Sequence, residues 1–414
     1  MLQDGRGGMA RDLECRFDFS KHQSPSLMTA WLLPEQFSDV LPTEARAIEQ
    51  LRRTLLDVAR GYGYELVIPP LVEYVDSLLS GTGQDLDLQT FKLVDQMSGR
   101  TLGLRADMTP QATRIDAHLL NRRGIVRLCY CGSVVHTRAQ GVFATREPLQ
   151  FGAEFYGHAG LDADLEVQQL AVRSLQLGGV QRMTLTLSDV RIVRGVLAGM
   201  VAGPQQLGEI LEALSRKDHA QLLELTQAAA PAQRDAILAL PDLFGDAAIL
   251  QQAAEALPDR PLIREALADL ERLAVTHVQA GVDVQIDLAD LRGYNYHSGV
   301  IFGLYAQGQP DALARGGRYD EIGATFGRPR AATGFSLDLR ELVRHAKAPE
   351  PTPAIRAQWS QRNGYSQAVH ALRQQGHTVI ELSEGATLEG KQFLFDRQLT
   401  CTEGQWHVLS YSPS

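Results

Sequence analysis

The sequence is poor in the residues that build metal centres and redox sites. It has four cysteines in 414 residues, and no two of them are separated by the two-residue gap of a zinc knuckle or a redox pair. We therefore expect neither a metal nor any other cofactor. So few thiols in so long a chain also favour a reducing, cytoplasmic compartment.

Long apolar runs and an excess of positive charge are missing as well. No segment approaches the length of a membrane span, and the first 27 residues contain no apolar stretch long enough for a signal peptide. The formal net charge is −9 at pH 7, whereas a protein that mainly binds nucleic acid more often has a basic balance. The sequence thus predicts no membrane association and counts mildly against RNA as the principal ligand.

The chain is long enough for one large domain and at least one smaller one. Hydrophobic residues make up 44% of it, so it can bury a substantial core. Residues 1–30 lack any helical or strand period and are predicted to be a disordered extension. The proline-punctuated segment 348–353 is typical of a linker. We therefore predict a large domain at 31–347, with a helical insertion at about 191–280, and a small C-terminal domain at 354–414.

Apolar periodicity predicts an α+β fold. Between residues 45 and 59 apolar side chains recur at three- and four-residue spacing, which indicates a helix, and the strand at 64–68 ends at two prolines. Because consecutive strands are joined by turns rather than by regular helical crossovers, we expect a mainly antiparallel sheet flanked by helices. A helix at 365–375 and a strand at 377–382 predict a small C-terminal α/β unit. The other predicted strands are 91–94, 101–105, 127–135, 147–156, 282–288 and 300–304, and the other helices are 110–121, 162–177 and 336–346.

The sequence contains two polar clusters. One lies where a strand meets a helix, and the other lies along one face of a strand. Asp107 and Thr109 follow a strand and precede a helix, so they either cap that helix or hold the ammonium group of a ligand. Gln150, Gly152 and Glu154 occupy alternate positions and therefore project from the same strand face. That face is either a solvated sheet surface or, because glycine leaves it open, the floor of a small-ligand site.

Two further clusters combine arginine, tyrosine and glycine. Arg292, Tyr294, Tyr296 and His297 lie in a glycine-flanked strand and turn. An arginine suits a carboxylate and tyrosine hydroxyls suit an imidazole, although His297 alone is more typical of a buried structural histidine. Residues 314–320 read as a glycine-hinged turn, which by itself is weak evidence for phosphate binding. Taken together, the clusters contain what a free amino-acid site requires.

The order of these segments resembles the catalytic domain of histidyl-tRNA synthetase, a class II aminoacyl-tRNA synthetase, over residues 31–345. The resemblance implies a class II synthetase-like fold, and the segment Ala47–Tyr74 is similar to the dimer-forming first motif of that class. The other segments that carry the resemblance are Leu104–Thr109, Leu149–Gly157, Arg292–Phe302, Gly316–Asp320 and Gly334–Leu342.

Carried over position by position, the resemblance implies a histidine site. Glu154 would face the imidazole, helped by Tyr296 or His297, and Arg292 would meet the carboxylate. Tyr294 would line the pocket. The residues implied to receive the α-amino group are Asp107, Thr109 and Gln150.

Two cations that class II synthetases use to hold ATP are displaced here. Where the second motif reads Phe-Arg-x-Glu, this chain has His136 in place of the arginine and Arg138 in place of the acid. In the third motif the arginine moves by one residue, to Arg340, which turns its side chain by about 100° on a helix. Losing fixed cations of this kind should leave little adenylate formation. Only 61 residues follow Pro353, fewer than an anticodon-binding domain needs.

With the histidine pocket kept, the ATP motifs changed and the tail shortened, the chain resembles the regulatory subunits of ATP phosphoribosyltransferase. The resemblance implies a subunit without catalytic residues that binds histidine for feedback control of the first step of histidine biosynthesis. It also implies a hetero-oligomer with a short-form catalytic subunit, self-association through the first motif and no binding of tRNA. The alternatives are an active histidyl-tRNA synthetase and a histidine-binding module that serves some other enzyme.

Overall fold

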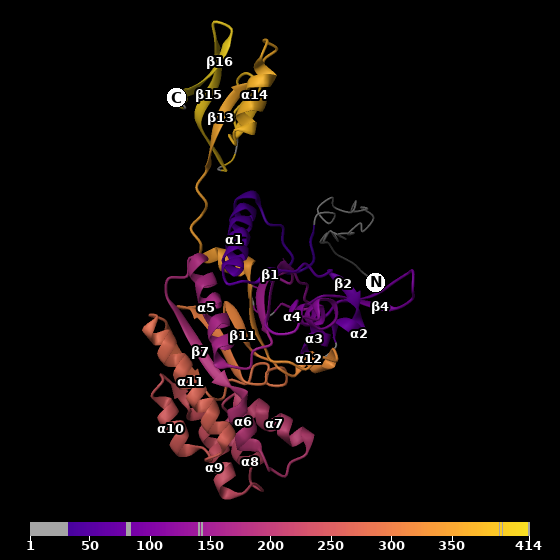
Figure 1. Ribbon diagram of the computed structural model, residues 1–414, viewed down its shortest axis with the longest axis vertical. Coiled ribbons are helices and arrows are strands. Elements are labelled where there is room, and N and C mark those ends of the chain that lie inside the picture. The colour runs from indigo at the N-terminus through magenta and orange to yellow at the C-terminus, as the bar shows by residue number, and fades with distance from the viewer. Residues whose placement is uncertain are drawn as a thin grey trace, which may run out of the picture.

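A nine-stranded sheet organises the larger part of the chain (Figure 1). The computed structural model describes residues 32–79, 84–139, 141, 144–388, 390 and 392–412, so the extension predicted at 1–30 lies outside the described residues. In spatial order the strands are β1 (Glu65–Leu66), β5 (Val126–Ser133), β6 (Leu149–Tyr156), β12 (Ala332–Asp338), β11 (Ala314–Arg318), β10 (Val300–Ala306), β7 (Met183–Asp189), β9 (Asp283–Asp287) and β8 (Phe244–Gly245). Six of the eight neighbouring pairs are antiparallel, which confirms the predicted sheet type.

Helices lie on both faces of this sheet. On one face α5 (Leu161–Leu177) crosses β6, β12, β11 and β10, and α1 (Pro42–Gly61) packs against α5. On the other face α4 (Thr109–Arg114), which continues as a π-helical turn at Ile115–Leu120, packs against β6. A smaller three-stranded sheet precedes α4 in the chain. It contains β2 (Val72–Tyr74), β4 (Thr101–Leu104) and β3 (Lys92–Val94), and the short helices α2 (Val75–Leu78) and α3 (Gln84–Gln89) connect β2 to β3.

The alternation of side chains along β6 separates the core from the polar face of the sheet. Phe151, Ala153 and Phe155 are buried in the hydrophobic core that α1 and α5 complete. Burial of one such phenylalanine contributes roughly 1.5 to 3 kcal/mol. Gln150 and Glu154 therefore lie on the opposite face, as the alternating sequence predicts.

The helical insertion is joined to the sheet through a buried charge cluster. Arg191, at the start of α6, bonds Asp189 at the end of β7 at 2.6 Å and Asp269 in α11 at 2.8 Å. Residues 191–280 are mainly helical as predicted, although the two-residue strand β8 interrupts them. The helices are α6 (Val190–Leu197), α7 (Pro204–Ser215), α8 (His219–Leu225), α9 (Pro231–Ala239) with a 3₁₀ turn at Leu240–Asp242, α10 (Ile249–Ala256) and α11 (Pro261–Gln279).

Three predicted assignments in the second half of the sheet are wrong or incomplete. Residues 336–338 belong to strand β12 rather than to a helix, and only α13 (Leu339–Leu342) with a 3₁₀ turn at Val343–His345 follows. Residues 314–318 form strand β11 rather than a turn, and β7 was not predicted. The physical reason is pairing with neighbouring strands, which overrides the local preference of a glycine-rich segment. The short helix α12 (Ile322–Thr325) lies between β11 and β12.

The C-terminal residues have a sheet and a core of their own. The predicted helix and strand are confirmed as α14 (Tyr365–Gln374) and β14 (Val379–Leu382), whereas β15 (Phe393–Thr402) and β16 (Gln405–Ser410) were not predicted. The four-stranded sheet has the order β14-β13-β15-β16, with β13 at Thr352–Gln358. In Figure 1 this unit lies beyond α1, at the end of the molecule away from α6–α11. None of the described helices combines the length and the apolar character that crossing a bilayer requires.

Candidate functional site

A cavity of about 800 Å³ lies on the polar face of the large sheet. Its wall combines sheet residues, the start of α4, the loop 291–297 and, from the helical insertion, residues of α7. Its volume is in the range of small-molecule sites. Of the eight residues predicted to bind histidine, two do not line this cavity, Gln150 and Arg292. Those that do are Asp107, Thr109, Glu154, Tyr294, Tyr296 and His297.

Glycines in the centre of the sheet make room for the polar side chains of the cavity floor. Glu154 lies opposite Gly334 of β12, and a Cβ atom on that glycine would come within 1.7 Å of the Glu154 carboxylate. In the same way a Cβ on Gly152 would come within 2.4 Å of the hydroxyl of Tyr130. The floor thus requires glycine at these two positions, because any other residue would displace Glu154 or Tyr130.

Glu154 is a buried carboxyl group surrounded by tyrosine hydroxyls. Its relative exposure is 1%, the hydroxyl of Tyr130 donates to Oε1 at 2.8 Å, and the hydroxyl of Tyr319 donates to Oε2. Burial raises the pKa of Glu154 from its ordinary 4.5 to about 8, although the two tyrosine bonds oppose the rise. At neutral pH the empty cavity therefore holds a protonated glutamic acid, which can donate a hydrogen bond to a ligand nitrogen.

Asp107, a second acid in the cavity lining, has one carboxylate oxygen committed and the other available. Its Oδ1 accepts from the backbone N–H of Thr109 at 3.0 Å, from the Thr109 hydroxyl at 3.1 Å and from Gln150 Nε2 at 2.8 Å. No hydrogen bond from the described residues reaches Oδ2. Asp107 thus binds the first turn of α4 and still presents a carboxylate oxygen to a ligand. Gln150 fixes this orientation, since its Oε1 accepts from the backbone N–H of Met108 at 2.9 Å.

The loop 291–297 brings aromatic groups to the cavity wall. Arg194 of α6 holds the loop, donating to the backbone carbonyls of Tyr294 at 3.2 Å and His297 at 2.8 Å. The ring of Tyr296 lies 5.3 Å from that of Tyr319, and its buried hydroxyl has no hydrogen-bond partner among the described residues. A buried hydroxyl without a partner is costly, so a polar ligand atom at this wall would relieve the cost.

Two of the predicted site residues face their own internal partners. Burial lowers the pKa of His297 to about 4, so its ring is neutral, and Nδ1 lies 3.3 Å from the carbonyl of Arg318. Arg292 lines a smaller adjoining cavity of about 170 Å³. Its Nε donates to Asp290 Oδ1 at 2.8 Å, and its terminal nitrogens donate to Asp290 and to the hydroxyl of Tyr305. The charge of Arg292 is therefore neutralised within the loop.

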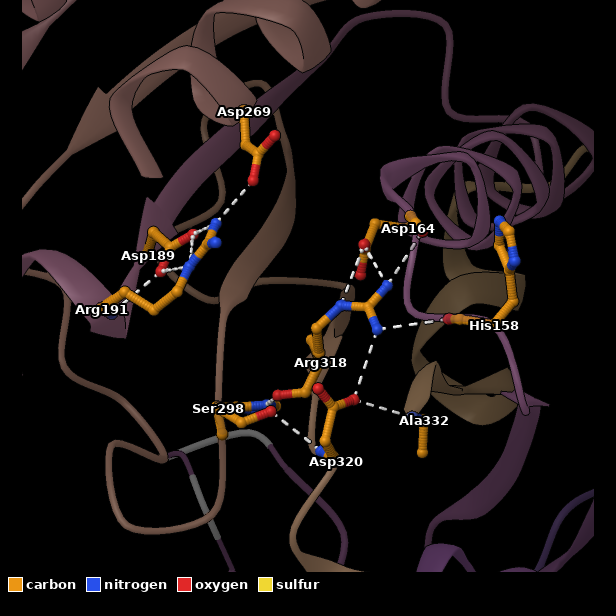
Figure 2. Close-up of polar contacts among 11 residues, drawn as sticks. His158, Asp164, Asp189, Arg191, Asp269, Ser298, Arg318, Asp320 and Ala332 are labelled. Carbon is orange, nitrogen blue, oxygen red and sulfur yellow. Dashed lines mark hydrogen bonds and ion pairs between the residues drawn. The ribbon is translucent and has the colours of Figure 1, made fainter. Parts of the chain in front are cut away.

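Arg318, in the segment that most closely resembles the synthetase, bonds to the helix side of the sheet (Figure 2). Its Nη2 lies 2.5 Å from Asp164 Oδ2 on α5 and donates to the carbonyl of Gly160 at 3.1 Å. A second bond at 3.3 Å joins it to Asp320, which accepts from the backbone N–H of Ala332 at 2.8 Å. The arginine of this motif is thus a structural residue that fastens β11 to α5.

The residues at the expected ATP-binding positions do not reach the cavity in the described part of the chain. His136 is buried and its Nε2 lies 2.9 Å from the carbonyl of Ala106, while burial lowers its pKa. Arg340 donates to the carbonyls of Glu147 at 3.2 Å and Ser38 at 3.0 Å. The one arginine in the described lining of the large cavity is Arg315 of β11. The described lining thus lacks the paired cations that a nucleotide triphosphate needs.

Several residues that line the cavity or bond to its lining were not predicted from the sequence. Tyr130 lies on β5 directly opposite Gly152, and the signal that could have found it is the glycine in the middle of the alternating polar face. Tyr319 belongs to the glycine-rich segment 314–320, which the sequence alone links only weakly to ligand binding. Leu211, Glu212 and Ser215 come from α7, and no local signal in the sequence points to their position in space.

Comparisons with known proteins identify the family of the chain. The family model described as histidyl-tRNA synthetase matches residues 36–342, and the model described as the ATP phosphoribosyltransferase subunit HisZ C-terminal domain matches residues 352–409. The ATP phosphoribosyltransferase regulatory subunit of Acidovorax sp. (strain JS42) is 55% identical over 381 residues, which are 92% of this chain and 99% of that protein.

Solved structures confirm the predicted class II synthetase-like fold. An ATP phosphoribosyltransferase regulatory subunit/histidyl-tRNA synthetase from Bacillus halodurans C is 25% identical with a TM-score of 0.76, covering 89% of this chain and 96% of its own. Histidyl-tRNA synthetase from Nostoc sp. PCC 7120 has a TM-score of 0.70 at 21% identity, covering 92% of this chain and 97% of its own, and shows the fold alone. The chain therefore belongs to the family of ATP phosphoribosyltransferase regulatory subunits.

Proposed function

We propose that this chain binds free histidine in the large cavity and thereby controls a catalytic partner. As a member of its family it is a regulatory, non-catalytic subunit of ATP phosphoribosyltransferase in histidine biosynthesis. The proposal adds the ligand and its site. The observation that carries it is the pairing of an available carboxylate oxygen on Asp107 with the buried acid Glu154 across one cavity.

The two ends of the cavity suit the two ends of histidine. A ligand ammonium group would bind Oδ2 of Asp107 with help from the hydroxyl of Thr109, in a charge-assisted bond. The imidazole would meet Glu154 and the unpartnered hydroxyl of Tyr296. Gln150 acts through Asp107, whose orientation it fixes. Tyr294 and His297 complete the wall. Arg292, which the resemblance implies as the carboxylate partner, lines the smaller cavity beside it, where Asp290 already neutralises its charge.

Replacing Asp107 by asparagine tests the ammonium end of this site. The variant keeps the shape of the side chain but removes the negative charge, so histidine should bind about 10- to 100-fold more weakly, the usual value of one charged hydrogen bond. The measurement is isothermal titration calorimetry with histidine. The matched control is Asp235→Asn on the exposed face of α9, which should bind like the parent. Equal affinity of the parent and Asp107→Asn would disprove the assignment.

The rival function, an active histidyl-tRNA synthetase, needs ATP in the same cavity. Besides the protonated Glu154, the described lining contains the acids Asp107 and Glu212 and one arginine, Arg315. That balance of charge repels a nucleotide triphosphate rather than holding it. Histidine-dependent exchange of pyrophosphate into ATP by the purified chain would establish the synthetase activity and overturn our proposal.

We propose that the partner is a short-form catalytic ATP phosphoribosyltransferase and that tRNA is not a ligand. Leu211, Glu212 and Ser215 of α7 line the cavity, so a bound ligand contacts the helical insertion as well as the sheet. Histidine changes the activity of a complex only if its two states bind histidine unequally, and a contact that spans two structural parts provides such a difference. The scarcity of thiols further supports a cytoplasmic location.

We also propose that the chain divides into a large domain at 31–347 and a small C-terminal domain at 354–414. Residues 354–414 contain a core cluster of their own, which includes Ile355, Tyr365 and Leu399. Contacts to the large part of the chain include Arg46 of α1, which donates to the backbone carbonyls of Glu350 at 2.8 Å and Gln392 at 3.2 Å. These contacts are polar and few enough for the C-terminal unit to fold around its own core.

We also propose that two copies of the chain associate through the first motif. The edge strand β1 and the small sheet expose a cluster of apolar side chains, and such a surface is typical of an interface. In a two-fold dimer one Ile68→Glu substitution places its charge at the interface twice. We expect the parent to sediment as a dimer and this variant as a monomer, while Val201→Glu stays dimeric. A monomeric parent would refute the proposal. The cluster comprises Leu66, Ile68, Leu71, Val72, Tyr74, Leu93 and Val94.

A further inference from the structure

The carboxylate of a bound amino acid needs a cation, and the cavity offers one that no assignment above uses. Arg315 lines both the large cavity and the smaller one beside it. Its side chain is exposed to the solvent-filled space, and it makes no hydrogen bond or ion pair with the other described residues. Glu341 lies close enough to feel its charge but forms no ion pair with it. Arg315 is thus a free guanidinium at the boundary of two cavities.

The other arginines around the site are already satisfied. Arg292 is paired with Asp290 and bonded to Tyr305. Arg318 is paired with Asp164 on the helix side of the sheet, and Arg194 donates to the carbonyls of the loop 291–297. A carboxylate that approached one of these arginines would have to displace an internal partner. Arg315 can bind the carboxylate without breaking an existing bond.

The strand register places Arg315 on the same face as the acid end of the site. Arg315 lies opposite Ser336 of β12 and Gly303 of β10. Ser336 in turn lies opposite Gly152 of β6, two residues before Glu154. From the spacing of strands and residues, the Cα atoms of Arg315 and Glu154 are about 12 Å apart. A long arginine side chain and one histidine molecule can bridge that span between them.

We infer that Arg315 binds the α-carboxylate of the ligand, at the boundary of the two cavities. The inference rests on the proposed function and adds the residue that distinguishes an amino acid from its amine. An arginine fork matches a carboxylate with two parallel hydrogen bonds. Ser336, the cross-strand partner of Arg315 on β12, lines the same cavity, so its hydroxyl can add a second donor to the carboxylate. Ligands without the carboxylate gain nothing from Arg315.

The test compares histidine with histamine, which lacks only the carboxylate, by calorimetric titration of the full chain. The parent should bind histidine about 10- to 100-fold more tightly than histamine. In Arg315→Gln this preference should disappear, because histidine binding weakens by that factor while histamine binding is unchanged. Unchanged histamine binding also shows that the variant is folded. The matched control is Arg173→Gln on the exposed side of α5, which should keep the preference for histidine within about threefold. A third variant, Arg292→Gln, tests the rival assignment of the carboxylate.

The possible outcomes separate the inference from the function on which it rests. A parent that binds neither compound overturns the histidine site and the role of Arg315 together. A parent that binds histidine, with an Arg315→Gln variant that binds it equally well, overturns the inference alone. Loss of the preference in Arg292→Gln but not in Arg315→Gln would assign the carboxylate to Arg292 instead. An equal loss of histamine binding in Arg315→Gln would show a general effect on the cavity and would also count against the inference.

Discussion

Replacing Arg318 by methionine will lower the free energy of unfolding by about 3 to 5 kcal/mol, the usual cost of removing one partner of a buried ion pair. The side chains of Arg318 and Asp164 are only 9% and 3% exposed, so the substitution leaves an unpaired carboxylate inside the protein. It also removes the donor to the carbonyl of His158, which Figure 2 shows, and the donor to the carbonyl of Gly160. The methionine fills a similar volume, which separates the loss of charge from the creation of a cavity.

Urea unfolding, followed by circular dichroism, measures this effect. The matched control is Arg264→Met, which breaks the exposed ion pair with Asp259 and should change the free energy of unfolding by less than about 1 kcal/mol. Adding Asp164→Leu to Arg318→Met removes the stranded carboxylate, so the double variant should recover much of the loss. An Arg318→Met variant as stable as the Arg264→Met control would contradict the structural role that we assign to this arginine.

The ion pair also illustrates what the sequence could not predict. Arg318 and Asp164 are separated by 154 positions, and nothing local distinguishes this arginine from a ligand-binding one. By contrast, the pair of Arg292 and Asp290 spans only two positions, so the acid was visible in the sequence. That Asp290 neutralises the charge of Arg292 becomes clear only when the loop conformation is known. Residue type and spacing predict which groups are present, but the partners decide which of them are available.

The polar floor of the cavity was predictable because it follows from a short period. Gln150, Gly152 and Glu154 alternate along one strand, and the structure places all three on one face. The strand β11 was missed because Gly316 and Gly317 locally favour a turn. In the sheet, Gly317 is required for a different reason, since a Cβ there would come within 3.0 Å of the His297 ring. Glycine in such a segment can indicate close packing rather than a bend.

The central glycines also explain why Glu154 is so deeply buried. Its carboxylate lies over Gly334, and Tyr130 and Tyr319 enclose it from two sides. This arrangement brings the carboxyl group of Glu154 close to a ligand but removes it from water. The loss of solvation raises its pKa. The same burial therefore links the binding site to the stability of the empty protein and to its dependence on pH.

The contribution of Glu154 to stability should fall as the pH rises. Its pKa is about 8 in the folded protein against an ordinary value of 4.5, so the folded state holds the proton more tightly than the unfolded state. The favourable contribution is complete below about pH 4.5 and is lost as the pH rises to about 8. In Glu154→Gln the neutral amide cannot ionise. Relative to the parent, this variant should therefore gain roughly 2 to 4 kcal/mol of stability between pH 5 and pH 8.5, because each pKa unit corresponds to about 1.4 kcal/mol.

Taking the difference between the parent and Glu154→Gln isolates this carboxyl group from the other buried titrating residues. His297 and His277, whose pKa values burial lowers to about 4, favour the folded state above pH 6.5 and act equally in both proteins. Glu265→Gln, on the exposed face of α11, supplies the control, and its difference from the parent should be the same at both pH values. If the difference in free energy of unfolding between Glu154→Gln and the parent were also the same at both pH values, the carboxyl group would already be ionised in the folded protein. In that case it would meet the imidazole as a charged acceptor rather than as a hydrogen-bond donor.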